Sequence, residues 1–226
     1  MWYIKMDEQS KAIKRRFNDG AFHTRYLVGR GIDIGGGPDP LGQYVRVFPL
    51  MLSAQTWDID KGDGDAQFMY GVKDNTYDFL SSSHCLEHIV NPQEAIYNWI
   101  RIVKPGGFLI VTVPDEDMYE GGVFPSRWND DHKHTFTIYK ERSWSPVSIN
   151  VLDLLIKFSS QIDIERVTLV NDFYRNPEVF KHFQEEFDQT LTPTTECAIE
   201  FIVQKKEIEN EGKEKSTGNT GLSRCT

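Results

Sequence analysis

Three consecutive glycines follow an acidic residue near the start of the chain. Asp33 stands two positions before Gly35, in the run Gly31-Ile32-Asp33-Ile34-Gly35-Gly36-Gly37. The apolar residues that precede the glycines are typical of a short buried strand. Glycines at the end of such a strand let a ligand approach the backbone, and the N–H groups of the next turn can bind a negative group. The run therefore predicts a binding loop, with an ordinary strand–helix turn as the alternative.

The spacing of this loop distinguishes two kinds of ligand. A dinucleotide site has the pattern G-x-G-x-x-G, but counting from Gly35 the third glycine would fall on Pro40. An acid two residues before the first glycine suits S-adenosylmethionine. The glycine N–H groups can bind its carboxylate, and Asp33 can compensate its ammonium group, directly or through water. The loop favours S-adenosylmethionine over a dinucleotide.

Further acidic residues could hold the nucleoside part of such a ligand. Asp58 follows Gly37 by 21 positions, near the spacing of about 20 residues at which an acid meets a ribose. Asp60 could take its place, and a solvated turn carboxylate is the alternative for either residue. The Asp65 carboxylate could accept a hydrogen bond from an adenine amino group, and the backbone beside Ala66 could meet a ring nitrogen.

The segment HCLEH, residues 84–88, places two histidines four positions apart. It is not the zinc pattern H-E-x-x-H, and no third ligand is obvious. No metal site is therefore expected. His84 is expected to face the molecule that reacts with S-adenosylmethionine. His88 is expected to have a structural role, either in packing or in a hydrogen bond.

A long polar connection, residues 115–136, follows the apolar run Phe108 to Val113. Such a connection lies at the carboxyl edge of a parallel sheet, where these folds bind ligands. We expect it to form an acceptor-binding lid that carries a general base, because an imidazole accepts a proton near neutral pH. A polar surface loop is the alternative. The lid concentrates Asp115, Arg127, Trp128, His132 and His134, and the candidate bases are, in order, His132, His134, His84 and Asp115.

The order of apolar segments predicts an α/β fold with a doubly wound sheet. Two late segments, 161–170 and 196–204, alternate apolar and polar residues with period two, which predicts a closing antiparallel hairpin. The result is a mixed sheet of seven strands. The other strands are expected at 30–34, 55–59, 77–82 and 108–113, and residues 63–66 are expected to form a turn with a short third strand. Helices are expected at 7–18, after Asp39-Pro40, at 92–103, at 145–158 and around 179–187.

A length of 226 residues fits one domain. We expect a single domain over 1–206, in which 1–29 form an N-terminal helical extension. The remaining segment, 207–226, is rich in Glu, Lys, Ser, Gly, Asn and Thr. It has too few apolar groups to build a core, so a disordered tail is expected.

Composition excludes several classes of partner. The chain has 25 Lys and Arg against 34 Asp and Glu, and a net charge of −9 argues against nucleic acid and anionic membranes. The cysteines Cys85, Cys197 and Cys225 share no close spacing, which favours a reducing compartment. No apolar run reaches the 18 or so residues of a membrane span, and the first 20 residues lack the apolar core of a signal peptide. A cytoplasmic protein with a small-molecule acceptor is expected.

The ordered motifs GIDIGGG, WDID, GDAQ, YDFLSSSHCLEHI and RIVKPGGFLIVTVP, within residues 31–114, resemble those of the class I S-adenosylmethionine-dependent methyltransferases. The most similar group is the small-molecule group called type 11. The resemblance implies a Rossmann-like sheet of seven strands that ends in an antiparallel hairpin. In two places the chain departs from the family pattern: Asp39 stands where the loop has its third glycine, and Pro49 lies within the first helix. The cofactor contacts implied are Asp33, Gly35, Gly37, Asp58, Asp65, Ala66 and Ser83.

We therefore expect methyl transfer from S-adenosylmethionine to a small polar or sugar-type acceptor, at oxygen. Two alternatives remain at this point. One is a nicotinamide-dependent oxidoreductase on a similar fold, against which Pro40 argues. The other is a protein that binds the cofactor without transferring the methyl group.

Overall fold

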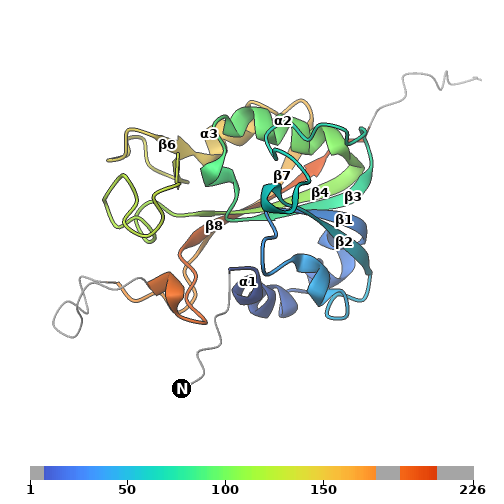
Figure 1. Ribbon diagram of the computed structural model, residues 1–226, viewed down its shortest axis with the longest axis horizontal. Helices are drawn as coiled ribbons and strands as arrows, with labels where there is room; N and C mark the ends of the chain where they lie inside the picture. Colours follow the sequence, from blue (N-terminus) through green and yellow to red (C-terminus); the bar gives the residue numbers. More distant parts are fainter. Residues whose placement is uncertain (1–7, 177–188, 208–226) are drawn as a thin grey trace, which may run out of the picture.

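A computed structural model describes residues 8–176 and 189–207. Its centre is a six-stranded sheet in the order β2-β1-β3-β4-β8-β7 (Figure 1). Neighbouring strands among β1 to β4 are parallel, whereas β8 is antiparallel to both β4 and β7. The strands are β1 (Gly29–Ile34), β2 (Met51–Trp57), β3 (Tyr77–Ser83), β4 (Val103–Pro114), β7 (Ile162–Val170) and β8 (Ala198–Lys205). A second, two-stranded parallel sheet pairs β5 (Thr135–Thr137) with β6 (Ser148–Asn150).

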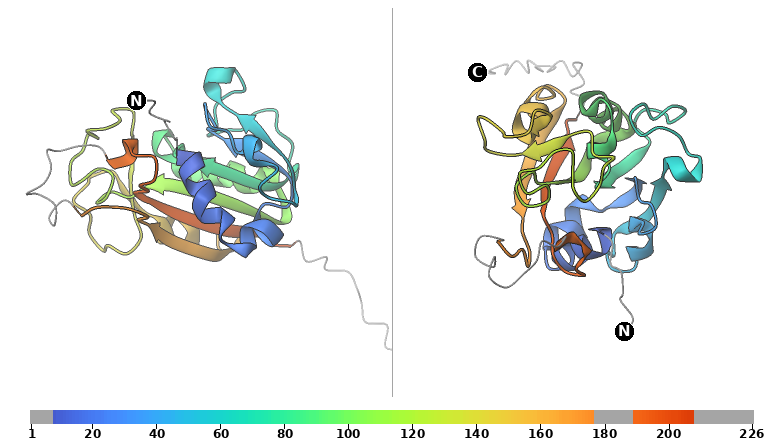
Figure 2. Two further views of the ribbon diagram at one scale, coloured as in Figure 1. Left: turned by 90° about the horizontal axis from the view of Figure 1, so that it is seen from below. Right: turned by 60° about the vertical axis from the view of Figure 1, so that its left-hand side comes forward.

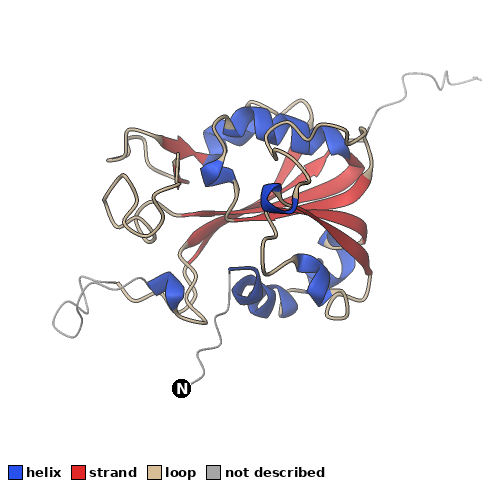
Figure 3. Ribbon diagram, in the orientation of Figure 1, coloured by secondary structure: helices blue, strands red, loops and turns tan. Residues whose placement is uncertain are grey.

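Helices cover both faces of the large sheet (Figure 3). The helices α2 (Pro92–Ile102) and α3 (Val151–Ile156) lie on one face, and α1 (Glu8–Phe17) lies on the other (Figures 1 and 2). Asn91 caps α2 by accepting a hydrogen bond from the Glu94 backbone N–H at 3.1 Å, and Pro92 fits the first helical position because it has no N–H to satisfy. Among the described residues, no helix combines the length and the apolar character needed to cross a bilayer.

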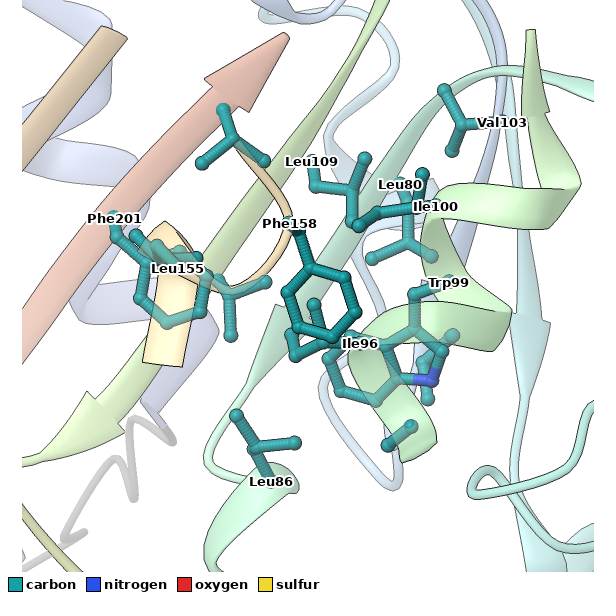
Figure 4. Packing of buried hydrophobic residues seen from close by; sticks show 14 of the residues in the cluster. Leu80, Leu86, Ile96, Trp99, Ile100, Val103, Leu109, Leu155, Phe158 and Phe201 are labelled. Atoms are coloured by element: carbon teal, nitrogen blue, oxygen red, sulfur yellow. The ribbon is translucent and has the colours of Figure 1, made fainter. Parts of the chain in front are cut away.

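Alternation along the central strands builds one core on each face of the sheet. Leu80 and Leu109 pack with Trp99 of α2 and Leu155 of α3 (Figure 4). Their chain neighbours point the other way: Phe79, Phe108 and Ile110 pack with Ile13 of α1 and with Phe22, Tyr26 and Leu27. Both cores exclude solvent at their centres, since Leu80, Leu109, Phe79 and Trp99 are fully buried.

Buried charges fasten α1 to β8. Arg16 and Glu200 are both 0% exposed, and the Arg16 guanidinium donates to Glu200 Oε2 at 2.7 and 3.0 Å. Arg15 donates to Glu200 Oε1 at 2.8 Å and to Glu196. Burial alone would raise the pKa of Glu200, but the two arginines outweigh it and lower the pKa to about 2. The helix thus attaches to the sheet by an ion-pair network as well as by apolar contact.

Most elements that the sequence predicts are confirmed, and the doubly wound fold with a closing antiparallel hairpin is present. The turn expected at 63–66 is present, but the short strand expected with it is not, so the large sheet has six strands rather than seven. Asp63 and Asp65 explain the difference. Their carboxylates accept hydrogen bonds from the nearby backbone N–H groups of Asp58 and Gln67 at 3.0 and 2.7 Å, which compete with strand pairing.

Two expected helices are shorter than the sequence suggests. After Asp39-Pro40 only one 3-10 turn forms, Leu41–Tyr44. In the segment 145–158, β6 comes first and α3 follows, because Asn150 caps that helix by accepting hydrogen bonds from Leu152 and Asp153. The helix expected around 179–187 and all but the first residue of the expected tail 207–226 lie outside the described residues.

Candidate active site

A pocket of about 320 Å³ opens at the carboxyl ends of β1, β2 and β3. The loops that follow these strands meet there, as expected for parallel strands of a doubly wound sheet. Most of the predicted cofactor segments contribute to its wall. The pocket is lined by Gly35, Trp57, Asp58, Ile59, Gly64, Asp65, Ala66, Gln67, Cys85, His88, Ile89, Val90, Asp131 and Lys133.

The glycine loop forms the pocket wall at the end of β1. Gly35 has a φ of +73°, and a Cβ at this position would lie 2.6 Å from Cys85 Cβ. A side chain is therefore excluded by both conformation and space. Gly37 also has a positive φ, of +45°, but a Cβ there would meet nothing closer than 3.8 Å.

Asp33, the acid before the glycines, is buried beneath the loop. Its Oδ2 accepts a hydrogen bond from the Leu41 backbone N–H at 2.7 Å. Its side chain is outside the set that lines the pocket. Burial raises the pKa of Asp33 to about 7, against the opposing effect of this hydrogen bond. The side chain thus supports the loop from behind.

Asp58 links the second strand to the glycine loop. Its Oδ2 accepts from the Gly37 N–H at 2.8 Å, and its Oδ1 accepts from the Asp60 N–H at 2.9 Å. Asp58 lines the pocket, whereas Asp60 is exposed and is not among the lining residues. The geometry therefore separates the two ribose candidates in favour of Asp58.

The adenine candidates Asp65 and Ala66 lie in a turn that hydrogen bonds connect to helix α2. The Ala66 carbonyl accepts from the Trp99 indole N–H at 2.9 Å. The Gln67 side chain donates to Glu94 at 2.7 Å and accepts from the Asn91 backbone N–H at 3.0 Å. Helix α2 thus positions this wall of the pocket.

Asp39, which stands at the third glycine position of the family pattern, has a structural partner in α1. Its Oδ2 accepts from the Ser10 backbone N–H at 2.7 Å and from the Ser10 hydroxyl at 2.6 Å. Its Oδ1 accepts from the Tyr44 hydroxyl at 2.8 Å. The replacement of glycine by Asp39 therefore fastens the N-terminal helix to the cofactor loop.

Next to the pocket lies a cluster of titratable residues formed by His84, Glu87, His88, Glu120 and His132, called here the histidine–glutamate cluster. Glu87 is its centre and is 0% exposed. Its Oε1 lies 3.5 Å from His84 Nδ1, 3.9 Å from His88 Nε2 and 4.0 Å from His132 Nε2. Burial would raise the pKa of Glu87, but the surrounding imidazoles hold it below its usual value.

The lid residue His132 enters this cluster from above. It is buried, its Nδ1 lies 2.6 Å from Glu120 Oε1, and its ring stacks on Tyr119 at 5.2 Å. The lid backbone is fixed as well, because the N–H groups of Lys133 and His134 both donate to the Glu87 carbonyl, at 2.8 and 3.2 Å. The lid therefore closes over the segment that follows β3.

His84 occupies the position directly after β3. Its φ of +52° is unusual for a residue with a side chain. Its Nε2 lies 3.6 Å from Glu8 of α1. Burial would lower the pKa of His84, but the charges of Glu8 and Glu87 outweigh it and raise the pKa.

The side chains of the remaining predicted site residues make no described contact with the side chains of the histidine–glutamate cluster, although the His134 backbone N–H donates to the Glu87 carbonyl. His134 Nε2 lies 3.2 Å from the Val90 carbonyl oxygen. Asp115 accepts from the N–H groups of Asp117 and Met118, and burial raises its pKa to about 6. The Ser83 hydroxyl is buried, with no hydrogen-bond partner among the residues that the structure describes.

Three members of the cluster were not among the predicted site residues: Glu87, His88 and Glu120. The only sequence signal for two of them is the HCLEH segment itself. Glu120 and His132 approach it through the fold of the lid, which spacing along the chain does not reveal.

Residues 7–146 match a family described as a methyltransferase domain. Phosphoethanolamine N-methyltransferase 2 of Caenorhabditis elegans is 25% identical over 123 residues, which are 47% of this chain. The chain spans 27% of the length of that relative.

Solved structures share the fold at low identity. A methyltransferase of Archaeoglobus fulgidus, described as dependent on S-adenosylmethionine, has a TM-score of 0.56 at 17% identity, over 88% of this chain and 94% of that one. Phosphoethanolamine N-methyltransferase 2 of Haemonchus contortus, solved with S-adenosyl-L-methionine, has a TM-score of 0.51 at 18% identity, over 88% of this chain and 52% of that one.

The pocket fits the cofactor of this family. It offers the side-chain-free wall at Gly35, a carboxylate at Asp58 for ribose hydroxyls, and the Asp65-Ala66 turn for an adenine. The nicotinamide alternative lacks its glycine pattern, because Pro40 stands where the third glycine is required. The chain therefore belongs to the methyltransferase domain family, and it shares its fold with S-adenosylmethionine-dependent methyltransferases.

Proposed function

We propose that the chain transfers the methyl group of S-adenosylmethionine to an oxygen atom of a small polar, sugar-type acceptor. The observation that carries this proposal is the position of the histidine–glutamate cluster. His88 belongs both to this cluster and to the lining of the cofactor pocket. Side chains that can accept or donate a proton therefore lie beside the cofactor pocket.

The pocket residues have a positioning role in this proposal. Asp58 and the Asp65-Ala66 turn hold the nucleoside, and the backbone around Gly35 accommodates the methionine end. Bound S-adenosylmethionine supplies an already activated methyl group, so the protein mainly aligns the donor and the acceptor. Ser83 lies at the end of β3, its hydroxyl has no hydrogen-bond partner among the described residues, and we assign it to the methionine end.

A hydroxyl acceptor also has to lose a proton, and His132 is the first candidate to take it. Hydrogen bonding of Nδ1 to Glu120 at 2.6 Å favours the tautomer with the proton on Nδ1 and a lone pair on Nε2. The order His132, His134, His84, Asp115 remains our proposal for the base. The structure favours His132 over His134, whose ring nitrogen faces a backbone carbonyl.

An amine is the second candidate acceptor, and one observation favours it. The similar proteins of Caenorhabditis elegans and Haemonchus contortus are phosphoethanolamine N-methyltransferases. Both are matched over only part of their length, so the class of acceptor needs its own test.

The test measures transfer of a labelled methyl group to a panel of hydroxylated sugars and to phosphoethanolamine. Transfer to a sugar hydroxyl supports the proposal; transfer to phosphoethanolamine alone contradicts it.

With the active acceptor, His132→Asn is expected to reduce kcat about 10²- to 10⁴-fold, as for other general bases. Asp130→Asn, at an exposed position of the same lid that is not a candidate base, is the matched control. Affinity for S-adenosylhomocysteine, measured by calorimetry, should be unchanged in both variants, and full activity of His132→Asn would rule out its role as base.

A further inference from the structure

We propose that Glu87, His88 and His132 bind a divalent transition-metal ion beside the cofactor pocket. One carboxylate oxygen and two imidazole nitrogens lie within 4.8 Å of one another. The two Nε2 atoms lie 3.9 and 4.0 Å from Glu87 Oε1. Tetrahedral ligands at bond lengths of about 2.0–2.2 Å lie about 3.4 Å apart, so each histidine would have to move about half an ångström closer to the carboxylate when the ion binds. The third ligand that HCLEH lacks along the sequence comes from the lid.

Glu87 gives an independent reason to expect a cation. Its side chain is fully buried, and neither carboxylate oxygen has a hydrogen-bond partner among the described residues. A buried carboxylate is unfavourable unless donors or a cation compensate it. The nearest other side-chain nitrogen of the described cluster, His84 Nδ1, lies 3.5 Å from Glu87 Oε1. A metal ion would satisfy the carboxylate directly.

Each proposed histidine ligand has a carboxylate behind it. Glu120 Oε1 lies 2.6 Å from His132 Nδ1, and Asp131 Oδ2 lies 2.9 Å from His88 Nδ1. A carboxylate in this position keeps the proton on Nδ1 and leaves the Nε2 lone pair for the metal, which is the usual arrangement around histidine ligands. Both Nε2 atoms are the ones that approach Glu87.

The donor set selects the kind of ion. Two imidazoles and one carboxylate suit Zn²⁺ and related transition metals, whereas Mg²⁺ and Ca²⁺ prefer oxygen ligands. Three protein ligands leave a coordination position open. His88 also lines the cofactor pocket, so an acceptor oxygen could occupy this position. In that role the ion would lower the pKa of a bound acceptor hydroxyl, and this role rests on the proposed function. Metal binding itself does not rest on it, but a metal-bound His132 would act as a ligand and not as the base.

The test titrates chelator-treated protein with Zn²⁺ and with Mg²⁺ by calorimetry, without cofactor. We expect one Zn²⁺ per chain and much weaker binding of Mg²⁺. His88→Ala should lower the Zn²⁺ affinity at least about 100-fold, since it removes a ligand, whereas Glu120→Gln should lower it about 10- to 100-fold. His134→Ala is the matched control, because this histidine lies in the same lid but outside the site, and it should keep the wild-type affinity.

Circular dichroism of the metal-free variants shows whether each one folds. The His88 imidazole is partly exposed, with 27% of its side chain accessible, so its removal should be tolerated. Asp131→Asn, at an exposed carboxylate, is a second variant expected to lower Zn²⁺ affinity. The proposal is overturned if the wild type shows no saturable Zn²⁺ binding, or if His88→Ala and Asp131→Asn bind as tightly as His134→Ala. Binding of S-adenosylhomocysteine to the metal-free wild type, measured separately, tests the cofactor site alone, so that failures of the two proposals can be told apart.

Discussion

Asp58 illustrates how one carboxylate can organise a cofactor site before the cofactor binds. Its two oxygens accept from the N–H groups of Gly37 and Asp60 at 2.8 and 2.9 Å. It therefore fixes the glycine loop relative to the end of β2 while remaining part of the pocket wall. The sequence placed both Asp58 and Asp60 at a suitable distance from the glycines, and only the fold distinguishes them.

Replacement of Asp58 should weaken cofactor binding much more than replacement of Asp60. Asp58→Ala removes an acceptor for the ribose hydroxyls and frees Gly37, so we expect about a 10- to 100-fold loss of affinity for S-adenosylhomocysteine, or roughly 1.4–2.8 kcal/mol. Asp60→Ala, at an exposed position two residues on, should bind within about 2-fold of wild type. Calorimetric titration of both variants checks this, and equal losses would exclude the assignment of Asp58.

The residues of the site differ in how far sequence could predict them. The glycine loop, Asp58 and Asp65 follow strand ends at regular spacings, so local pattern suffices for them. Glu120 and His132 meet Glu87 through a lid of irregular backbone, and no periodicity encodes that approach. Asp39 is the opposite case: it departs from the family pattern, and its reason becomes visible only in its hydrogen bonds to Ser10.

Among the elements, the central strands β3 and β4 were predictable because their apolar residues are buried on both faces of the sheet, and the hairpin was predictable from its period-two alternation. The errors occurred where short polar side chains decide the local backbone. Asp63 and Asp65 replace a strand by turns, and Asn150 starts α3 later than Ser145 would. Such side-chain caps depend on single hydrogen bonds, which segment composition does not reveal.

The contact between α1 and β8 should depend on the buried charge of Glu200. Glu200→Gln leaves Arg16, which is 0% exposed, without its full counter-charge. Losing one partner of a buried pair typically costs about 3–5 kcal/mol of the free energy of unfolding. Urea unfolding followed by circular dichroism measures this change. Glu165→Gln, which removes the ion pair of a half-exposed arginine, Arg25, is the control and should cost less than about 1 kcal/mol.

The same glutamate gives the helix contact a dependence on acid. The folded pKa of Glu200 is about 2, below its ordinary value of 4.5. Its contribution to stability is therefore present above about pH 4.5 and is lost as the pH falls toward 2. In Glu200→Gln this part of the acid sensitivity should disappear. An unchanged acid profile would mean that other carboxylates control unfolding.

For the whole molecule, we propose that the polar segment 207–226 adds nothing to the stability of the domain. The described chain ends its last strand at Lys205, and the Lys206 N–H still donates to the Gln161 carbonyl at 2.9 Å. Truncation after Lys206 retains these contacts, so the melting temperature should stay within about 1 °C, a change that corresponds to a few tenths of a kcal/mol. A clear drop in calorimetric melting temperature would show that the segment contacts the domain.

The pH dependence of stability near neutrality should be set in part by Asp33. Its folded pKa is about 7, because burial raises it from 3.8. Between these two values the folded state holds a proton that the unfolded chain has released. The free energy of unfolding therefore falls as the pH rises through this window, by at most about 1.4 kcal/mol per pH unit, and the effect levels off above about pH 7.

Asp33→Asn isolates this effect. The amide keeps the size of the side chain and an oxygen that can accept from the Leu41 N–H, but it has no proton to lose in this range. The difference in unfolding free energy between variant and wild type should therefore grow in favour of the variant from about pH 5 to about pH 7. Urea unfolding at intervals of about one pH unit measures it, and comparing the two proteins at each pH cancels the titration of all other groups. A difference that does not change with pH would show that Asp33 is already ionised beneath the glycine loop. In that case its charge, rather than its burial, would control how the loop meets the ammonium group of the cofactor.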